Sequence, residues 1–390
     1  MTGRTPAAGP GPLIAAALAL SLLLGVVTGA LGAALPLLRT AYGLGDGSGA
    51  ELVVLYNLGA LLAIVGCGLG ARRLPGRALM TVLLTAFAGS TAGMALAPHW
   101  WLLCAFALVA GVGYGGLILH LNTFFAQPSL PRPALLLNVL HACFGAGATL
   151  GPLLVGQWGG VSWLLLVTGA LSLLLVRATA AGESAQGTGE TASRRPSAPL
   201  LAVFALMALA YAGVEAGIGA LESTHLSALG HDPADAARFT ALFWAGLTVG
   251  RLVVPWAARR LSHPQLIGVC LLAAAGALAA TLAAAVAPVA YGLAGLALAA
   301  VFPTTLAWAN ALLPAPERVN SALLVANLVG SAALPYLIGL AAPGRWAAIP
   351  LSLTGLTLLC GLAVAVATRL AHRPAALPRP APHHELETSP

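Results

Sequence analysis

Residues 178–199 have the sequence ATAAGESAQGTGETASRRPSAP and form the one long polar connection inside an otherwise apolar chain. Their Gly, Ser, Thr and Ala content is typical of a flexible linker. Six apolar segments precede this linker and six follow it. Because the linker divides the apolar segments equally, it predicts a chain built from two halves of similar size.

The composition of the whole chain is that of a membrane protein. Hydrophobic residues make up 59% of the 390 residues and charged residues only 7%, whereas soluble domains carry about 25% charged residues. A soluble fold of this length could not bury so much apolar surface, since its own surface grows too steeply with mass. We therefore expect lipid to surround most of the chain.

The apolar segments have the length of membrane-spanning helices, which need about 20 mostly apolar residues each. The first one is too long for the apolar region of a signal peptide and lacks a clear cleavage pattern. The twelve expected spans cover residues 13–38, 51–71, 78–97, 101–125, 134–156, 161–177, 200–228, 238–257, 265–287, 289–313, 320–342 and 347–369. The sequence predicts an all-α polytopic membrane protein.

The basic residues indicate the orientation of the chain. All 18 of them are Arg, and only three, Arg39, Arg238 and Arg345, are assigned to connections that follow odd-numbered spans. Those in connections after even-numbered spans are Arg72, Arg73, Arg77, Arg132, Arg177, Arg194, Arg195, Arg259, Arg260 and Arg318. The positive-inside rule then places both termini in the cytoplasm and the chain in the cell membrane. Because the Arg residues are spread over many short loops, they do not form a surface for nucleic acid.

We expect the first six-helix bundle at residues 1–177, the second at 200–370, and a Pro-rich disordered tail at 371–390. The five Cys residues lie singly in apolar stretches, which favours a packing role. No metal site and no cofactor are expected. The expected partners are lipid, a small-molecule solute and protons, and we expect the chain to work as a monomer.

Short motifs recur between the two halves. The sequence Ala-Arg-Arg-Leu at residues 71–74 returns at 258–261, 187 residues later. Gly147, Pro152 and Gly156 match Gly330, Pro335 and Gly339, each 183 residues later, and Asn122 matches Asn310 188 residues later. Several matches at nearly one offset indicate a duplication and two pseudo-symmetric halves. Transporters built in this way bind their solute between the halves, near the middle of the membrane.

Two acidic residues lie inside an expected span, and charges there are functional candidates because they are costly. Glu215 and Glu222 are seven residues apart, so they share one helix face. Counted from Leu200, Glu215 lies about 22 Å and Glu222 about 33 Å along the helix, which puts Glu222 at the outer rim. A buried carboxyl group can take up a proton near neutral pH. Glu215 is the main candidate for proton coupling or solute binding and Glu222 the second, with a structural polar role as the alternative for both.

Polar and aromatic side chains inside the other spans are candidates for solute binding. Amide groups and flat rings suit a polyhydroxylated solute, although interhelical hydrogen bonding is the alternative for each of them. The candidates are His120, Asn122, Asn138, His141, Tyr211, Trp308, Asn310 and Asn327, and the wider polar set includes Tyr56, Asn57, Tyr114 and Asn320.

Arg251 is the one Arg inside an apolar segment. It lies about two turns from the cytoplasmic end of its span, close enough for the side chain to reach the surface. We expect a gate or structural role for it, and the same for Arg72, Arg73 and Arg259 of the repeated loop motif.

Several of these stretches resemble the fucose:proton symporter family. They are LNVLHACFGAG at 137–147, YAGVE at 211–215 and FWAGLTVGR at 243–251. The resemblance implies the major facilitator fold and uptake of a sugar-like solute with protons. Family symporters can carry an acid in the first and in the fourth helix, and this chain has neither, so Glu215 becomes the main candidate for the proton site.

Two other functions are alternatives to symport. Gly147, Gly151, Pro152 and Gly156 also resemble, imperfectly, the fifth-helix motif of drug:proton antiporters, so efflux of a drug or metabolite is the alternative. An enzyme would need a clustered nucleophile, base or metal set, which the sequence lacks. The Glu-x-x-His at residues 222–225 has no second copy, as a di-iron bundle would require.

Overall fold

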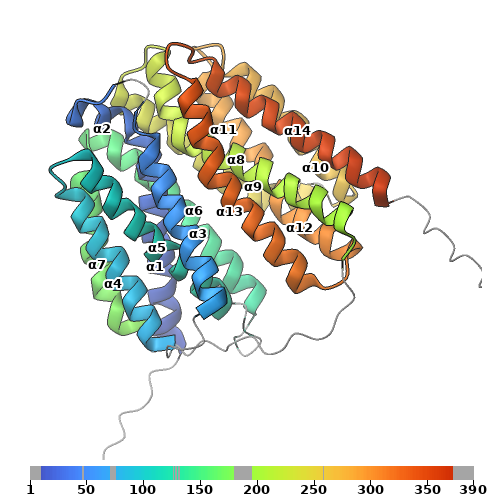
Figure 1. The fold of residues 1–390 in the computed structure, drawn as a ribbon, viewed down its shortest axis with the longest axis horizontal. Helices are drawn as coiled ribbons and strands as arrows, with labels where there is room; N and C mark the ends of the chain where they lie inside the picture. Colours follow the sequence, from blue (N-terminus) through green and yellow to red (C-terminus); the bar gives the residue numbers. More distant parts are fainter. Residues whose placement is uncertain are drawn as a thin grey trace, which may run out of the picture.

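The computed structural model describes residues 10–45, 48–70, 76–125, 127, 130, 132–179, 196–257 and 259–371, and every regular element within these ranges is a helix. In chain order the helices are α1 (Pro10–Ala33), α2 (Leu35–Tyr42), α3 (Ala50–Gly70), α4 (Gly76–Ala95), α5 (Trp100–Phe125), α6 (Pro133–Trp158), α7 (Ser162–Thr179), α8 (Ala198–Ala228), α9 (Pro233–Ala257), α10 (His263–Ala280), α11 (Ala287–Leu298), α12 (Val301–Leu312), α13 (Pro316–Ala341) and α14 (Ala348–Ala371) (Figure 1).

These helices confirm the twelve predicted spans. Eleven helical segments of the described chain are long and apolar enough to cross a membrane, and the apolar part of α7 at Ser162–Leu175 is shorter. The first predicted span corresponds to α1 together with α2, and the tenth to α11 together with α12. The predicted boundary at residue 238 was wrong, because α9 begins at Pro233. Asp232 extends that helix, since its carboxylate accepts a hydrogen bond from the Ala234 N–H at 2.9 Å.

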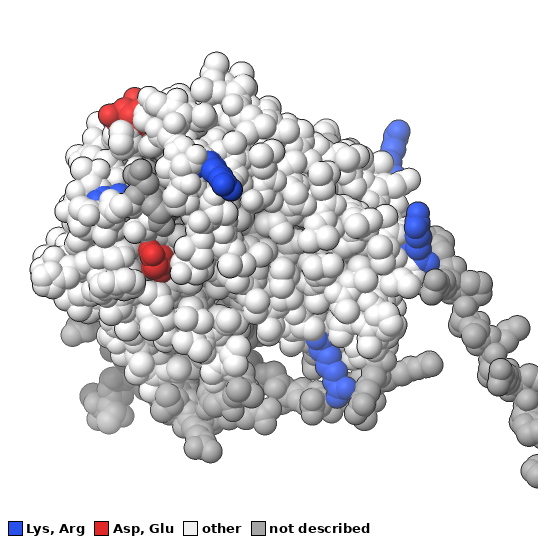
Figure 2. Space-filling model, turned by 45° about the horizontal axis from the view of Figure 1, so that its top comes forward, with Lys and Arg blue, Asp and Glu red and all other residues white. Residues whose placement is uncertain are grey.

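The lipid-facing surface carries few charges and many large apolar side chains. Leu174, Leu272 and Leu62 are 75%, 71% and 54% exposed. In a water-soluble protein such a surface would associate or aggregate. Figure 2 shows the same property over one whole face, where charged side chains are few and widely spaced.

The helices form two halves, each with its own apolar core. The core of α1–α7 contains Leu24 and Phe87, and that of α8–α14 contains Phe204 and Leu353, all of them fully buried. Figure 1 shows the first half, from blue to green, beside the second, from yellow-green to red.

The motif repeats occupy equivalent packing positions in the two halves. Gly147 of α6 lies against the Leu22 carbonyl of α1, and Gly330 of α13 lies against the Leu209 carbonyl of α8. The fifth span therefore packs on the first as the eleventh packs on the seventh, which confirms the predicted pseudo-symmetry. The Arg-Arg repeat at 71–74, and with it Arg72 and Arg73, lies outside the described residues, as do most of the linker and the tail from 372 onward.

Contacts between the halves can be placed along the membrane normal. We call the side on which α7 ends and α8 begins the linker side. On the opposite side, the Ser223 hydroxyl donates to the Gly32 carbonyl at 2.8 Å, and Arg39 donates to the Thr224 hydroxyl at 3.1 Å. We call these contacts of Gly32 and Arg39 with Ser223 and Thr224 the closed seam. In Figure 1 the helices of the two halves lie closest at the top and spread apart toward the bottom, where the linker side lies.

Candidate functional site

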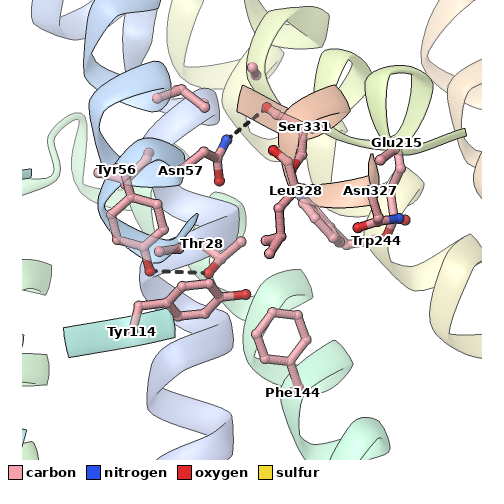
Figure 3. Close-up of a pocket in the computed structure, with 18 residues that line it drawn as sticks. Thr28, Tyr56, Asn57, Tyr114, Phe144, Glu215, Trp244, Asn327, Leu328 and Ser331 are labelled. Atoms are coloured by element: carbon pink, nitrogen blue, oxygen red, sulfur yellow. Dashed lines mark hydrogen bonds between the residues drawn. The ribbon is translucent and has the colours of Figure 1, made fainter. Parts of the chain in front are cut away.

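A cavity of about 200 Å³ lies between the two halves, midway along the spans. The first half lines it with α1, α3, α5 and α6, and the second with α8, α9 and α13. Its polar and aromatic lining residues are Thr28, Tyr56, Asn57, Tyr114, Phe144, Glu215, Trp244, Asn327 and Ser331 (Figure 3). The cavity therefore has the central location that the duplicated architecture predicts.

The wall from the first half is aromatic. The ring centroids of Tyr56 and Tyr114 are 5.1 Å apart, and Phe144 follows Tyr114 at 6.4 Å. The Tyr56 hydroxyl lies 3.5 Å from the Thr28 hydroxyl. This wall offers a solute flat apolar surfaces edged by hydroxyl groups.

The wall from the second half contains an ion pair. Arg251 of α9 lies 3.3 Å from the Glu215 carboxylate of α8, with side chains 31% and 21% exposed. Tyr211, one turn before Glu215, lies next to both charges, and Tyr114 interacts with both electrostatically from the first half. The pair is thus a charge-neutral unit that reaches the cavity surface through Glu215.

The sequence places the Arg251 side chain within reach of the linker-side surface, and the gate or structural role expected for it stays a prediction. Its guanidinium is bonded to Glu215 instead. A charge-assisted hydrogen bond to a carboxylate within reach is stronger than a neutral one. The Glu215 carboxylate therefore keeps the Arg251 side chain in position.

Asn57 connects the two halves across the cavity. Its side-chain amide donates to the Ser331 carbonyl of α13 at 3.0 Å. Asn327 lies one turn before Ser331, on the same wall of the cavity. Amide groups from both halves thus face the same space (Figure 3).

Of the main candidates from the sequence, Glu215 and Asn327 line this cavity, and so do Tyr56, Asn57 and Tyr114 of the wider polar set. The other main candidates are not among the lining residues.

The Asn122 amide donates to the Ile118 carbonyl of its own helix at 2.8 Å, and the Asn310 amide donates to Asn320 at 2.8 Å. The Asn310–Asn320 bond joins α12 to α13, which is the interhelical alternative considered for these residues, whereas the Asn122 bond stays within α5. Solute binding by Asn122 and Asn310 stays a prediction.

The aromatic and His candidates have different surroundings. Trp308 packs edge-on against Phe204 at 5.0 Å, and Tyr211 stacks on Phe302 at 5.8 Å. Asn138 and His141 are exposed on α6, where His141 lies within electrostatic range of Arg251, and His120 on α5 is half-buried. Solute binding by these residues remains a prediction.

Arg259, a further candidate, lies just beyond the end of α9. Arg259 is exposed, donates to the Trp256 carbonyl at 3.0 Å and lies over the Trp256 ring at 5.2 Å. Its predicted gate or structural role remains a prediction. The residues of the cavity that the sequence did not single out are Thr28, Phe144, Trp244 and Ser331; two of them, Phe144 and Trp244, lie inside the motifs quoted for the family resemblance.

Glu222 lies near the outer end of α8, at the height that the sequence predicts, and it is buried there. Its side chain is completely buried, and neither carboxylate oxygen has a hydrogen-bond partner among the described residues. The height along α8 was estimated well, but α1, α2 and α11 cover this end of the helix. The sequence could not show that neighbouring helices bury this end of α8.

The twelve spans, the two related halves and the cavity between them define a transporter and not an enzyme. The sequence profile of the Major Facilitator Superfamily matches residues 17–318. This match covers most of the chain, so the chain belongs to the Major Facilitator Superfamily. No curated protein sequence matches it significantly.

Solved structures of transporters share this fold. A bacterial homolog of the human lysosomal transporter Spinster, inward-facing and unoccupied, has 16% identity and a TM-score of 0.71, with 95% of this chain and 97% of that chain covered. A D-xylose-proton symporter has 13% identity and a TM-score of 0.70, with 92% and 97% covered. A peptide transporter solved with sulfate has 13% identity and a TM-score of 0.78, with 94% and 96% covered.

Proposed function

We propose that the chain moves a small, sugar-like solute together with protons across the cell membrane by alternating access. The observation that carries this proposal is the ion pair between Arg251 and Glu215, whose side chain lines the cavity between the two halves. The fold supplies the two halves, and the pair supplies a group that can bind and release a proton next to the solute.

The cavity lining supports a polar solute with hydroxyl groups. Asn57 and Asn327 present amide groups that both donate and accept hydrogen bonds. Tyr56, Tyr114 and Phe144 present ring faces against which the apolar face of a sugar ring can pack. The resemblance to the fucose:proton symporter family points to the same class of solute.

The ion pair gives proton coupling a physical basis. While Glu215 is ionised, it neutralises Arg251. A proton on Glu215 would leave the Arg251 charge without its partner, and a polar solute or a movement of α9 could then compensate it. Proton occupancy and solute occupancy are linked in this scheme because both act on the same guanidinium.

We further propose that the linker side faces the cytoplasm, as the distribution of Arg indicates. The closed seam then seals the cavity from the outside, and the structure corresponds to a state that opens toward the cytoplasm. A single chain contains both walls of the cavity, in line with a monomer.

Uptake of labelled sugars tests the proposed function directly. Cells without their own sugar permeases would be given L-fucose, D-xylose and D-glucose, with and without a protonophore. We expect accumulation of at least one sugar, lost with the protonophore and in Glu215→Gln. The control is Glu51→Gln, since Glu51 accepts a backbone hydrogen bond from Gly49 at 2.6 Å and does not line the cavity.

The outcomes of this assay separate the parts of the proposal. Uptake that needs the proton gradient but survives Glu215→Gln would place the proton elsewhere. If none of the three sugars enters, the sugar assignment fails.

Efflux of a drug or metabolite by proton antiport is the second candidate. The aromatic wall of Tyr56, Tyr114 and Phe144 favours it, since planar apolar compounds also bind such surfaces. Antiport predicts that cells producing the protein retain less of a fluorescent planar dye, and that a protonophore restores the dye level. Sugar accumulation in the uptake assay would contradict efflux by proton antiport.

A pair of Asn variants distinguishes cavity residues from residues that bond within their own helix. Asn57→Ala is expected to raise the KM for the transported sugar about tenfold, the scale of a lost hydrogen bond to a polar solute. Asn122→Ala is expected to leave KM unchanged, because Asn122 does not line the cavity and its amide is bonded within its own helix. Concentration-dependent initial rates of uptake provide the measurement. Equal effects of the two variants would contradict the assignment of this cavity as the binding site.

A further inference from the structure

A row of titratable side chains continues from the cavity along one face of α8 toward the closed seam. Glu222 lies seven residues after Glu215, and His225 lies three residues after Glu222. Because these spacings are close to whole helical turns, the three side chains share a face, and Glu222 lies about 10 Å beyond Glu215 along the axis.

Glu222 has the surroundings of a neutral carboxylic acid. It is 0% exposed, and both of its oxygens are without hydrogen-bond partners among the described residues. The ion pairs among the described residues, Arg238–Asp235 and Arg251–Glu215, do not include Glu222. An ionised Glu222 would be an uncompensated buried charge, which is far more costly than a buried neutral group.

A hydrogen-bonded pair lies next to Glu222 on its seam side. The Tyr291 hydroxyl of α11 lies 2.9 Å from His225 Nδ1, and both side chains are buried. Tyr291 is also close enough to Glu222 to interact with it electrostatically. A Tyr hydroxyl and a His ring each donate and accept hydrogen bonds, so together they can pass a proton.

The His225–Tyr291 pair lies close to the membrane surface opposite the linker. His225 is in the last turn of α8, and Tyr291 is in the second turn of α11, each about 5 or 6 Å from the helix end. Its neighbours Ser223 and Thr224 make the closed seam with Gly32 and Arg39. The pair therefore lies behind the seam, inside the second half.

On its other side, Glu222 approaches the cavity. Gly219 and Ala220 line the cavity between Glu215 and Glu222. Gly219 has no side chain, and Trp244 lies against it. Water in the cavity can thus come within one turn of Glu222.

We infer that Glu222 is a second proton-binding site, supplied through the His225–Tyr291 pair from the side of the closed seam. A proton enters at His225, the Tyr291 hydroxyl gives its proton to the Glu222 carboxylate and takes one from His225, and no other bond changes. The charged and titratable groups around this route are Tyr291 of α11, His225 of α8, Arg39 of α2 beyond Thr224, and the Glu215–Arg251 pair two turns away.

This inference deepens the proposed function, on which its role in transport rests. The solute passes between the halves, whereas the proton passes through the second half. Separate routes allow a proton to bind while the seam is closed to the solute.

Infrared spectroscopy of the purified full-length protein tests the route without knowledge of the solute. We expect a carbonyl band of a buried protonated carboxyl group in the wild type, in Glu215→Gln and in Glu51→Gln, and its loss in Glu222→Gln. After dilution into D2O, the shift of this band reports exchange of the proton. Tyr291→Phe removes only the hydroxyl and is expected to slow that exchange at least ~100-fold, the lower range for a lost proton-transfer group.

Three outcomes would overturn the inference: a band that persists in Glu222→Gln, a wild type without the band, or unchanged exchange in Tyr291→Phe. Glu222→Asp retains the carboxyl group and must keep a band, so this variant provides the test if Glu222→Gln does not fold. Failure of sugar uptake would overturn the proposed solute and leave these spectra unaffected, so the two failures are distinguishable.

Discussion

Arg251→Leu is expected to abolish transport and to lower the stability of the protein, while adding Glu215→Gln restores stability without restoring transport. Removing the guanidinium leaves the Glu215 carboxylate without its partner at 3.3 Å. Breaking a buried pair in this way costs about 3–5 kcal/mol, and we expect about 1–3 kcal/mol here because the pair is partly open to the cavity. The Glu215→Gln change removes the unpaired charge and with it the cost.

The measurements are thermal unfolding of the purified variants and sugar uptake in cells. Arg238→Leu is the matched control, since its ion pair with Asp235 is 42% and 50% exposed and contributes less than about 1 kcal/mol. An Arg251→Leu protein as stable as the wild type would show that the pair is not a buried unit. A double variant that still accumulates sugar would remove the pair from the coupling mechanism.

The fold could be predicted from the sequence because the membrane imposes it. A span needs a nearly fixed apolar length, and the polar linker at 178–199 divides the spans into two sets. The start of α9 before residue 238 was missed because a local hydrogen bond, the Asp232 cap, sets it. A hydropathy pattern does not contain such local bonds.

The cavity could be predicted only in part, because sequence alone does not give the rotation of a membrane helix. Lipid and protein core both select apolar residues, so a span has no polar face that marks its buried side. Glu215 was found because a charge in a span is rare. Asn57 and Asn122 look equivalent in sequence, yet one crosses the cavity to Ser331 and the other bonds to Ile118.

Gly32→Val is expected to abolish sugar uptake by holding the closed seam open. A Cβ atom at Gly32 would overlap the Gly219 carbonyl oxygen and the Ala220 Cα, which are backbone atoms of the other half. Backbone cannot rotate away as a side chain can, so α1 and α8 must separate and the Ser223–Gly32 hydrogen bond is lost. A transporter that cannot close one side cannot complete alternating access.

Labelling from outside the cell measures this state of the seam. Ala220→Cys is introduced after the five native Cys are replaced by Ser, and intact cells are treated with a membrane-impermeant maleimide. We expect weak labelling in this background and strong labelling when Gly32→Val is added. Gly268→Val on α10 is the control, because a Cβ there has no heavy atom within 4 Å.

The same experiment also examines the orientation of the chain. If the linker side faced the exterior, Ala220 would be approached through the open side of the cavity, and Gly32→Val would not increase the labelling. Normal uptake in Gly32→Val would contradict the closed seam itself, since the valine would then fit between α1 and α8. Strong labelling together with loss of uptake would show that the seam faces the outside and that its closure is a required step of transport. The Gly268→Val control excludes a general effect of an added valine side chain.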